Sequence, residues 1–238
     1  MKEFLNKPIA HRGLHNEKDP ENSLSAFSNA IEKSYPIEID LHLTSDNIIY
    51  VFHDDNLKRM TGLDKLIKDS NKEELSTLRL NNTKESIPTL KQVLDLVDGK
   101  VPLLIEIKKD GKPKEIAEIL TSMLKDYKGT VAVQSFYPDY LYFVRKFNPK
   151  IKRGQLATCK FPSSIPHIQR FASKNMLGNP ISRPSFIAYD FRCLPMPIVS
   201  LYKKLGYPIL GYTITNKEDE MKARKVCDNI IFENYIPD

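Results

Sequence analysis

Residues 37–62 read IEIDLHLTSDNIIYVFHDDNLKRMTG, and this stretch decides how the rest of the chain is interpreted. Apolar and polar residues alternate at its start, which is the period of a β-strand. Glu38, Asp40 and His42 therefore share one face of the predicted strand. Two carboxylates on an inward face repel each other and lose water, which favours a cation between them. A strand held by ordinary salt bridges is the alternative.

A hairpin is expected directly after this strand. Asp46 and Asn47 suit a tight reversal, because both residue types tolerate unusual backbone angles. The chain then returns as IIYVF and ends on His53. We therefore expect an imidazole to lie beside the two carboxylates.

Strand and helix patterns alternate along the rest of the chain. Besides the strand at 37, strands are expected at 8–11, 101–108, 130–136, 151–156, 186–189, 209–214 and 229–232. Helices are expected at 22–33, 89–97, 113–127, 138–147, 164–175, 197–205 and 217–226. Eight strands with helical crossovers predict an α/β fold, a closed (β/α)₈ TIM-type barrel. An open doubly wound sheet is the alternative, but no Gly-rich phosphate fingerprint follows the first strand.

The predicted barrel accounts for the whole chain, residues 1–238, as a single domain. Residues 63–86 form a polar excursion and are expected to be a small insertion after the hairpin. The last outer helix is expected to be missing or very short, because little sequence follows the eighth strand.

Composition places the chain among ordinary globular proteins, with 41% hydrophobic and 28% charged residues. The net charge of +6 suits an anionic small substrate or weak contact with an anionic membrane surface. Nucleic acid is disfavoured as a partner, because the lysines are spread along the chain. The N-terminus lacks a secretory h-region. Three cysteines without metal-type spacing are expected to be reduced and buried, which favours a cytoplasmic location.

The carboxyl ends of the predicted strands carry the candidate site residues, because chemistry in such barrels sits there. Titratable groups crowd the first three strands and the hairpin, and later strands supply mainly neutral and aromatic groups. The candidates are His11, Arg12, Glu38, Asp40, His53, Glu106, Lys108, Phe136 and Tyr212.

Three carboxylates without a thiolate favour one hard divalent cation, Mg²⁺ or Ca²⁺. Arg12 and Lys108 either neutralise these acids or hold an anionic substrate oxygen, which Arg12 can do bidentately. His11 and His53 come from different elements. Imidazole as a side-chain type titrates near neutral pH, so the two could act as general base and general acid. This combination is typical of phosphodiester cleavage.

Seven segments follow one another along the chain in a recognisable order: AHRG (10–13), PENS (20–23), EIDLHLTSDN (38–47), VFHDDNLKRMTG (51–62), IPTL (87–90), LLIEIK (103–108) and QSF (134–136). Together they resemble the glycerophosphodiester phosphodiesterase family, within the phospholipase C-like superfamily of TIM-barrel phosphodiesterases. The resemblance implies a metal held by Glu38, Asp40 and Glu106, with His11 and His53 as the acid–base pair. It also implies that Arg12 and Lys108 contact phosphate.

The implied activity is metal-dependent hydrolysis of glycerophosphodiesters to glycerol 3-phosphate and an alcohol. A lysophospholipase D acting on single-chain lipids, or a catalytically silent phosphate- or membrane-binding barrel, are the alternatives. The chain departs from the family pattern twice. Tyr212-Thr213 stands where the family usually has Trp-Thr, and residues 230–234 read IIFEN instead of ending in Thr-Asp. The second departure is expected to affect only the closing edge of the barrel.

Four further residues carry weaker expectations. His42 either faces the site or bonds to a neighbouring strand, and Glu21 either orients Arg12 or caps the first helix. His15 and His167 are expected at the surface. Phe136 and Tyr212 are either packing at the barrel top or contacts for the glycerol or leaving alcohol.

Overall fold

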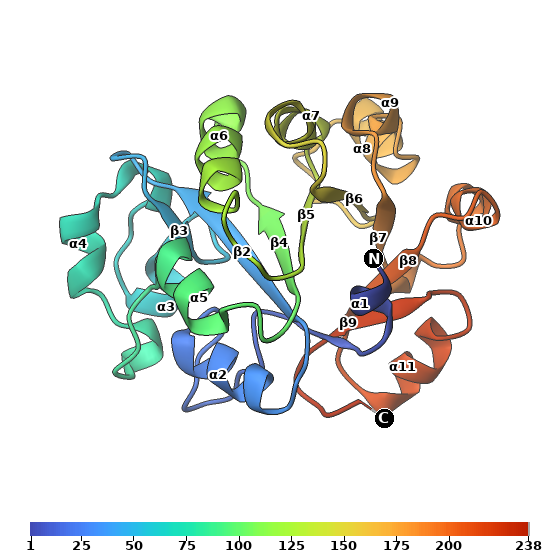
Figure 1. The fold of residues 1–238 in the computed structure, drawn as a ribbon. Helices are drawn as coiled ribbons and strands as arrows, with labels where there is room; N and C mark the ends of the chain where they lie inside the picture. Colours follow the sequence, from blue (N-terminus) through green and yellow to red (C-terminus); the bar gives the residue numbers. More distant parts are fainter. Residues whose placement is uncertain (238) are drawn as a thin grey trace.

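Eight parallel strands close into a barrel in the computed structural model, which describes residues 1–237 (Figure 1). The strands, with an antiparallel ninth, are β1 (Ile9–Ala10), β2 (Ile37–Leu43), β3 (Ile49–Val51), β4 (Leu103–Ile107), β5 (Val131–Ser135), β6 (Lys152–Ala157), β7 (Phe186–Asp190), β8 (Ile209–Ile214) and β9 (Asn229–Phe232). β1 closes the ring, because it pairs with both β2 and β9. β3 runs antiparallel to β2, with Asn47 at a φ of 60° in the connecting turn. The predicted barrel and hairpin are both confirmed.

Helices surround this ring of strands (Figure 1). They are α1 (Lys2–Leu5), α2 (Leu24–Glu32), α3 (Lys58–Thr61), α4 (Lys72–Thr77), α5 (Leu90–Val97), α6 (Pro113–Met123), α7 (Pro138–Phe147), α8 (His167–Lys174), α9 (Asn179–Ser182), α10 (Pro197–Lys204) and α11 (Lys217–Ala223), with 3₁₀ turns η1 (Ile67–Asp69), η2 (Leu80–Asn82) and η3 (Phe191–Cys193). The short helices α1 and α9 were not predicted. Residues 233–237 contain no helix, as expected. None of the helices within residues 1–237 is both long and apolar enough to cross a bilayer.

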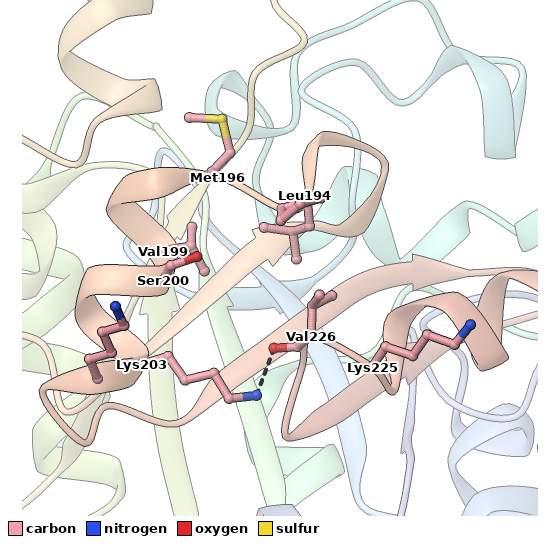
Figure 2. Close-up of a pocket in the computed structure, with 9 residues that line it drawn as sticks. Leu194, Met196, Val199, Ser200, Lys203, Lys225 and Val226 are labelled. Carbon is pink, nitrogen blue, oxygen red and sulfur yellow. Dashed lines mark hydrogen bonds between the residues drawn. The ribbon is translucent and has the colours of Figure 1, made fainter.

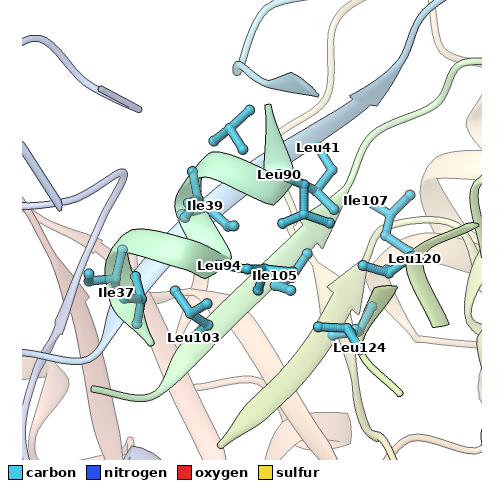
Figure 3. Close-up of a cluster of buried hydrophobic side chains, with 14 of the residues drawn as sticks. Ile37, Ile39, Leu41, Leu90, Leu94, Leu103, Ile105, Ile107, Leu120 and Leu124 are labelled. Atoms are coloured by element: carbon cyan, nitrogen blue, oxygen red, sulfur yellow. The ribbon is translucent and has the colours of Figure 1, made fainter. Parts of the chain in front are cut away.

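The largest apolar cluster lies between the strands and the outer helices. Figure 3 shows β2 and β4 contributing their outward side chains to it, with α5 and α6 covering them. α5 buries Leu90, Val93, Leu94 and Val97, whose spacing of three and four residues places them on one helical face. Thr89 and Gln92 cap the start of α5 reciprocally. The helix predicted at 89–97 is therefore confirmed.

A second cluster fills the barrel interior. It includes Ile9, Leu104, Leu156 and Leu210, and Phe4 of α1 joins it. Strand side chains alternate between the two faces. Glu106, two residues after Leu104 on β4, therefore faces the interior, and so do Glu38 and Asp40, which alternate with the outward residues of β2. The packed core thus lies below the polar groups at the strand ends.

β8 departs from simple alternation near its end. Its register with β9 shifts between Gly211 and Ile214, so Ile214 packs outside with the helices while Leu210 faces the interior. Simple alternation would set Tyr212 and Ile214 on one face, but this irregularity places them in different clusters.

The insertion after the hairpin has a small apolar core of its own. Phe52, Leu57, Ile67, Leu75 and Leu80 are buried together there. Although residues 63–86 are rich in polar side chains, their few apolar ones suffice to pack the segment against the end of the hairpin.

Candidate active site

Three acidic side chains meet at the carboxyl ends of β2 and β4. These strands are parallel, and their register sets Asp40 beside Glu106. Glu38 precedes Asp40 on the same inward face. All three side chains are buried, and each offers an oxygen within 4.8 Å of the others. Hard oxygen donors in this number and spacing suit a divalent cation such as Mg²⁺ or Ca²⁺, so the acidic triad could hold a metal.

Two cations partly neutralise this acidic triad. The Nζ atom of Lys108 lies 2.7 Å from Asp40 Oδ1 and 2.6 Å from Glu106 Oε1. The Nε atom of Arg12 lies 3.3 Å from Asp40 Oδ2, and its backbone N–H donates to Glu38 Oε2 at 3.2 Å. Three carboxylates thus face two fixed cations, which leaves an excess of negative charge for a metal ion to offset.

The two acids of β2 respond differently to this environment. Burial would raise the pKa of Asp40, but the positive charges of Lys108, His53 and Arg12 outweigh it and hold that pKa well below its usual range. Burial and the negative charges of Asp40 and Glu106 raise the pKa of Glu38. Without a further cation, Glu38 is therefore the member of the triad that resists ionisation.

An unusual backbone conformation presents Arg12 to these acids. Its φ is 56°, in the left-handed region, and Gly13 follows with a φ of 83°. A Cβ on Gly13 would lie 2.9 Å from the backbone of Ala26, so this position requires glycine for space as well as for φ. The two left-handed residues of the HRG sequence, Arg12 and Gly13, therefore turn the chain at the end of β1.

Each of the two candidate histidines is held by a carboxylate. The Nδ1 atom of His11 lies 2.6 Å from Glu233 Oε2, and that of His53 lies 2.6 Å from Asp54 Oδ1. Burial opposes ionisation of both acids, but their partners lower the pKa of Asp54 to about 2 and that of Glu233 below its usual range. An ionised carboxylate only accepts hydrogen bonds, so Nδ1 of each imidazole carries the proton. The Nε2 atom of each imidazole is therefore the one that can accept a proton.

Glu233 is a site residue that the sequence analysis missed. It lies just beyond β9, in the IIFEN segment that was expected to affect only the closing edge of the barrel. That expectation is wrong, because β9 pairs with β1 and thereby sets Glu233 against His11. His15, expected at the surface, is also partly buried here, with Nε2 3.7 Å from Glu233 Oε2. His167 is exposed, as expected.

A chain of ion pairs links the two histidine regions. Asp54 pairs with Arg59 at 2.6 Å, Arg59 with Glu21 at 2.7 Å, and Glu21 with Arg12 at 2.8 Å. Glu21 therefore orients Arg12. It does not cap α2, whose N-cap is Ser23. Because α3 carries Arg59, the segment after the hairpin is connected to the site.

His42 lies in a supporting position behind the site. It is fully buried, with Nδ1 2.7 Å from Asp110 Oδ1 and Nε2 3.3 Å from the backbone oxygen of His53. Asp110 also accepts a hydrogen bond from the Leu43 N–H. Of the two expectations for His42, hydrogen bonding to a neighbouring segment matches the structure. No sequence signal marked Asp110 as its partner.

Neutral and aromatic groups form the opposite side of the barrel mouth. The rings of Phe136 and Tyr212 meet edge to face, with centroids 6.3 Å apart. The Tyr212 hydroxyl donates to the Ala157 carbonyl at 2.8 Å, and burial raises the pKa of this phenol. Gln134, level with Glu106 in the sheet, is buried, and its Oε1 has no hydrogen-bond partner among the described residues.

The cysteine expectation is wrong for two of the three residues. Cys159 and Cys193 form a disulfide, although 34 residues separate them. β6 and β7 are neighbours, so the segments that follow them meet at the barrel mouth. Cys227 is free and buried, as expected, and burial raises the pKa of its thiol to about 12. The disulfide removes the cysteine argument for a cytoplasmic location, which stays a prediction.

Together, the closed barrel and the charged groups at its mouth define a phosphodiesterase-type barrel enzyme. The chain belongs to the glycerophosphoryl diester phosphodiesterase family, whose sequence profile matches residues 11–234. A glycerophosphodiester phosphodiesterase from Caldanaerobacter subterraneus is 31% identical over 238 residues, covering 95% of this chain and 93% of that protein.

Solved structures agree with this family membership. A phosphodiesterase from Oleispira antarctica, in complex with the product sn-glycerol-3-phosphate, matches with a TM-score of 0.83 and 26% identity. The match covers 98% of this chain and 94% of that one. A glycerophosphodiester phosphodiesterase from Thermotoga maritima matches with a TM-score of 0.73 and 28% identity, covering 95% and 94%.

Proposed function

We propose that this phosphodiesterase hydrolyses small glycerophosphodiesters to glycerol 3-phosphate and an alcohol, with one divalent cation and two histidines. The observation that carries the proposal is a buried acidic triad flanked by two imidazoles, each held through Nδ1 by an ionised carboxylate. The relative that binds sn-glycerol-3-phosphate as its product supports the choice of substrate.

In this proposal Glu38, Asp40 and Glu106 hold Mg²⁺ or Ca²⁺. When bound, the metal supplies a positive charge that polarises the phosphoryl group and offsets negative charge in the transition state. Arg12 and Lys108 bind phosphate oxygens, because both lie at the triad and point their cationic groups toward it. Phe136 and Tyr212 line the side where the glycerol or leaving alcohol binds.

We assign the general base to His53. Burial lowers the pKa of this imidazole, so it is neutral and able to accept a proton at Nε2 near pH 7. The proton comes from the attacking hydroxyl, which belongs either to the substrate glycerol or to water. His11 is then the general acid: in its doubly protonated form it keeps the Nδ1 proton on Glu233, gives the Nε2 proton to the departing alkoxide and becomes neutral.

Metal removal tests the first half of this proposal. Chelation should abolish turnover of glycerophosphocholine, and added Mg²⁺ or Ca²⁺ should restore it. Glu106→Gln should weaken metal binding measured by calorimetry, because it removes one charge from the triad. Glu218→Gln is the matched control, since Glu218 lies on the exposed face of α11. Full activity in metal-free protein would contradict the metal role.

A parallel substrate series separates the alternative functions. The proposed function expects turnover of glycerophosphocholine to exceed that of lysophosphatidylcholine. The reverse order would identify a lysophospholipase D. A catalytically silent barrel would turn over neither substrate with any metal.

A further inference from the structure

Acidic residues are unevenly distributed along the chain. Of its 30 Asp and Glu residues, only Asp190 lies within residues 140–217, and that carboxylate is buried and paired with Arg192. The same segment contains thirteen Lys and Arg residues. It includes β6, α8, α9, β7 and α10, so these elements are basic and expose no acid of their own, although Asp228, beyond the segment, pairs with Lys203 of α10.

The same segment exposes most of the large apolar side chains at the surface. Ten such side chains are exposed within residues 1–237, and six of these lie between residues 168 and 205. α8 is the clearest case, because none of its residues is fully buried. Ile168 is 79% exposed and Phe171 61%, and their spacing of three residues places them on one helical face.

Lysines stand near both ends of α8 in the sequence. Lys160 precedes α8 and Lys174 ends it, and both are exposed with no ion pair among residues 1–237. Leu177 follows α8 and is 57% exposed. We call these five residues, Lys160, Ile168, Phe171, Lys174 and Leu177, the α8 surface.

α10 repeats this outward pattern. Leu201 and Leu205 are exposed four residues apart, and Lys204 lies between them on the same side. A groove of about 440 Å³ lies beside them, and Leu194, Val199 and three lysines, Lys203, Lys204 and Lys225, are among the residues that line it (Figure 2). The Cys159–Cys193 disulfide joins the segments that lead into α8 and α10. The two helices are therefore tied together near the barrel mouth.

We propose that the α8 surface docks this barrel onto an anionic lipid bilayer. Exposed apolar side chains beside unpaired lysines suit an interface where the apolar groups enter the headgroup region and the lysines meet anionic lipids. The lack of exposed acids removes the repulsion that such a surface would otherwise meet. α8 follows the carboxyl end of β6, so docking there sets the barrel mouth beside the bilayer. This inference goes beyond the proposed reaction and does not depend on it.

Vesicle co-sedimentation tests the proposal directly. The full chain should bind vesicles of phosphatidylglycerol and phosphatidylcholine but not vesicles of phosphatidylcholine alone. Ile168→Ser combined with Phe171→Ser should lower the partition coefficient about ten-fold or more, because it removes the apolar contact. Lys160→Glu combined with Lys174→Glu should have a similar effect. Added salt should weaken binding of the wild type by screening.

Two control variants match these changes elsewhere on the surface. Met221→Ser alters an equally exposed apolar residue on the acidic helix α11. Lys125→Glu combined with Lys128→Glu reverses two exposed charges before β5, at the amino end of the barrel. Both controls should bind anionic vesicles as the wild type does. All variants should hydrolyse soluble glycerophosphocholine at the wild-type rate, so a failure of docking remains distinct from a failure of the proposed chemistry.

Two outcomes would overturn the proposal. One is wild-type binding that is equal on anionic and neutral vesicles, or absent from both. The other is unchanged vesicle binding by the two α8-surface variants. Sedimentation velocity tests whether two copies of the chain meet through this surface instead. A wild-type dimer that becomes a monomer on Ile168→Ser with Phe171→Ser, and that does not bind vesicles, would assign the surface to that contact.

Discussion

The two sides of the barrel mouth differ in how their groups are held. On the side of β1, β2 and β4, buried acids, cations and imidazoles are linked by ion pairs between residues far apart in sequence. On the side of β6, β7 and β8, aromatic rings, a disulfide and exposed apolar helices take their place. The difference teaches that buried, paired charges and exposed apolar surface are separated within one ring of strands.

The charged side depends on mutual compensation. A buried carboxylate is costly unless a partner offsets its charge. Here Lys108 offsets Asp40 and Glu106, and Glu38 is the acid whose charge a metal ion could offset. On the other side, the uncharged residues at the mouth, Phe136 and Tyr212, have no such requirement, and we call these two residues the neutral side. Substitutions there leave the charge balance of the triad intact. Changes on the charged side should therefore reduce turnover of every substrate alike, whereas changes on the neutral side should alter the preference among substrates.

The largest effect is expected from removing a histidine on the charged side. His53→Ala should lower kcat by roughly 10²–10⁴, the usual size of general acid–base catalysis, and should change substrate binding much less. Steady-state kinetics with two different diesters should give the same proportional loss. His167→Ala is the matched control, because that histidine is exposed on α8. Turnover by His53→Ala within a few-fold of wild type would make His53 a structural residue.

A smaller loss is expected from the carboxylate that holds His11. Glu233→Gln keeps the size of the side chain, but its amide can donate as well as accept, so His11 Nδ1 is no longer restricted to the protonated form. We expect kcat to fall about 10- to 100-fold, less than for loss of the imidazole itself. NMR of the His11 ring nitrogens should report the changed tautomer. An unchanged tautomer with unchanged kcat would remove Glu233 from the site.

A change on the neutral side should alter selectivity and spare the metal. Tyr212→Trp introduces the family's usual residue, which is larger and cannot reproduce the hydroxyl contact to Ala157. Relative kcat/KM among glycerophosphoethanolamine, glycerophosphocholine and a lysolipid should shift about ten-fold, near 1.4 kcal/mol, toward the bulkier diesters. Metal affinity should stay the same. A uniform loss on all three substrates would make Tyr212 part of the scaffold and erase the contrast between the two sides.

The smallest effect concerns pH. Because burial lowers the pKa of His53 below its ordinary value of 6.5, more than half of this imidazole is neutral at pH 6.5. As a base it works when neutral, so kcat/KM should decline only as the pH falls below 6.5. A pH–rate profile of the wild type with a saturating metal checks this sign. An acidic limb centred above 6.5 would contradict the assignment of His53 as the base.

Much of the fold could be predicted from local patterns in the sequence. Alternation in residues 37–43 set Glu38 and Asp40 on one strand face, and the helix expected at 89–97 is present as α5. The strands 209–214 and 229–232 and the helix 138–147 match their expected limits. Such features are readable because side-chain direction repeats with a short period in strands and helices. Eight strands that alternate with helices then predict the closed barrel, a topology in which helices cover the outward apolar face of every strand.

Partners that meet through barrel closure could not be predicted in this way. Glu233 and His11 are 222 residues apart, and only the pairing of β9 with β1 brings them together. The Cys159–Cys193 disulfide and the His42–Asp110 contact arise in the same manner from neighbouring strands. The register shift in β8, which separates Tyr212 from Ile214, is likewise not indicated by any pattern in the neighbouring residues.

By itself, then, the sequence determined which residue types stand at which strand ends, since this follows from periodicity along a few consecutive residues. Tertiary structure alone decided which carboxylate holds which imidazole, which cysteines meet, and which helices keep apolar faces in solvent. The physical reason is the distance along the chain over which each effect acts. Strand and helix periods act between residues a few positions apart, whereas ion pairs, disulfides and exposed faces depend on distances that exist only once the ring of strands has closed.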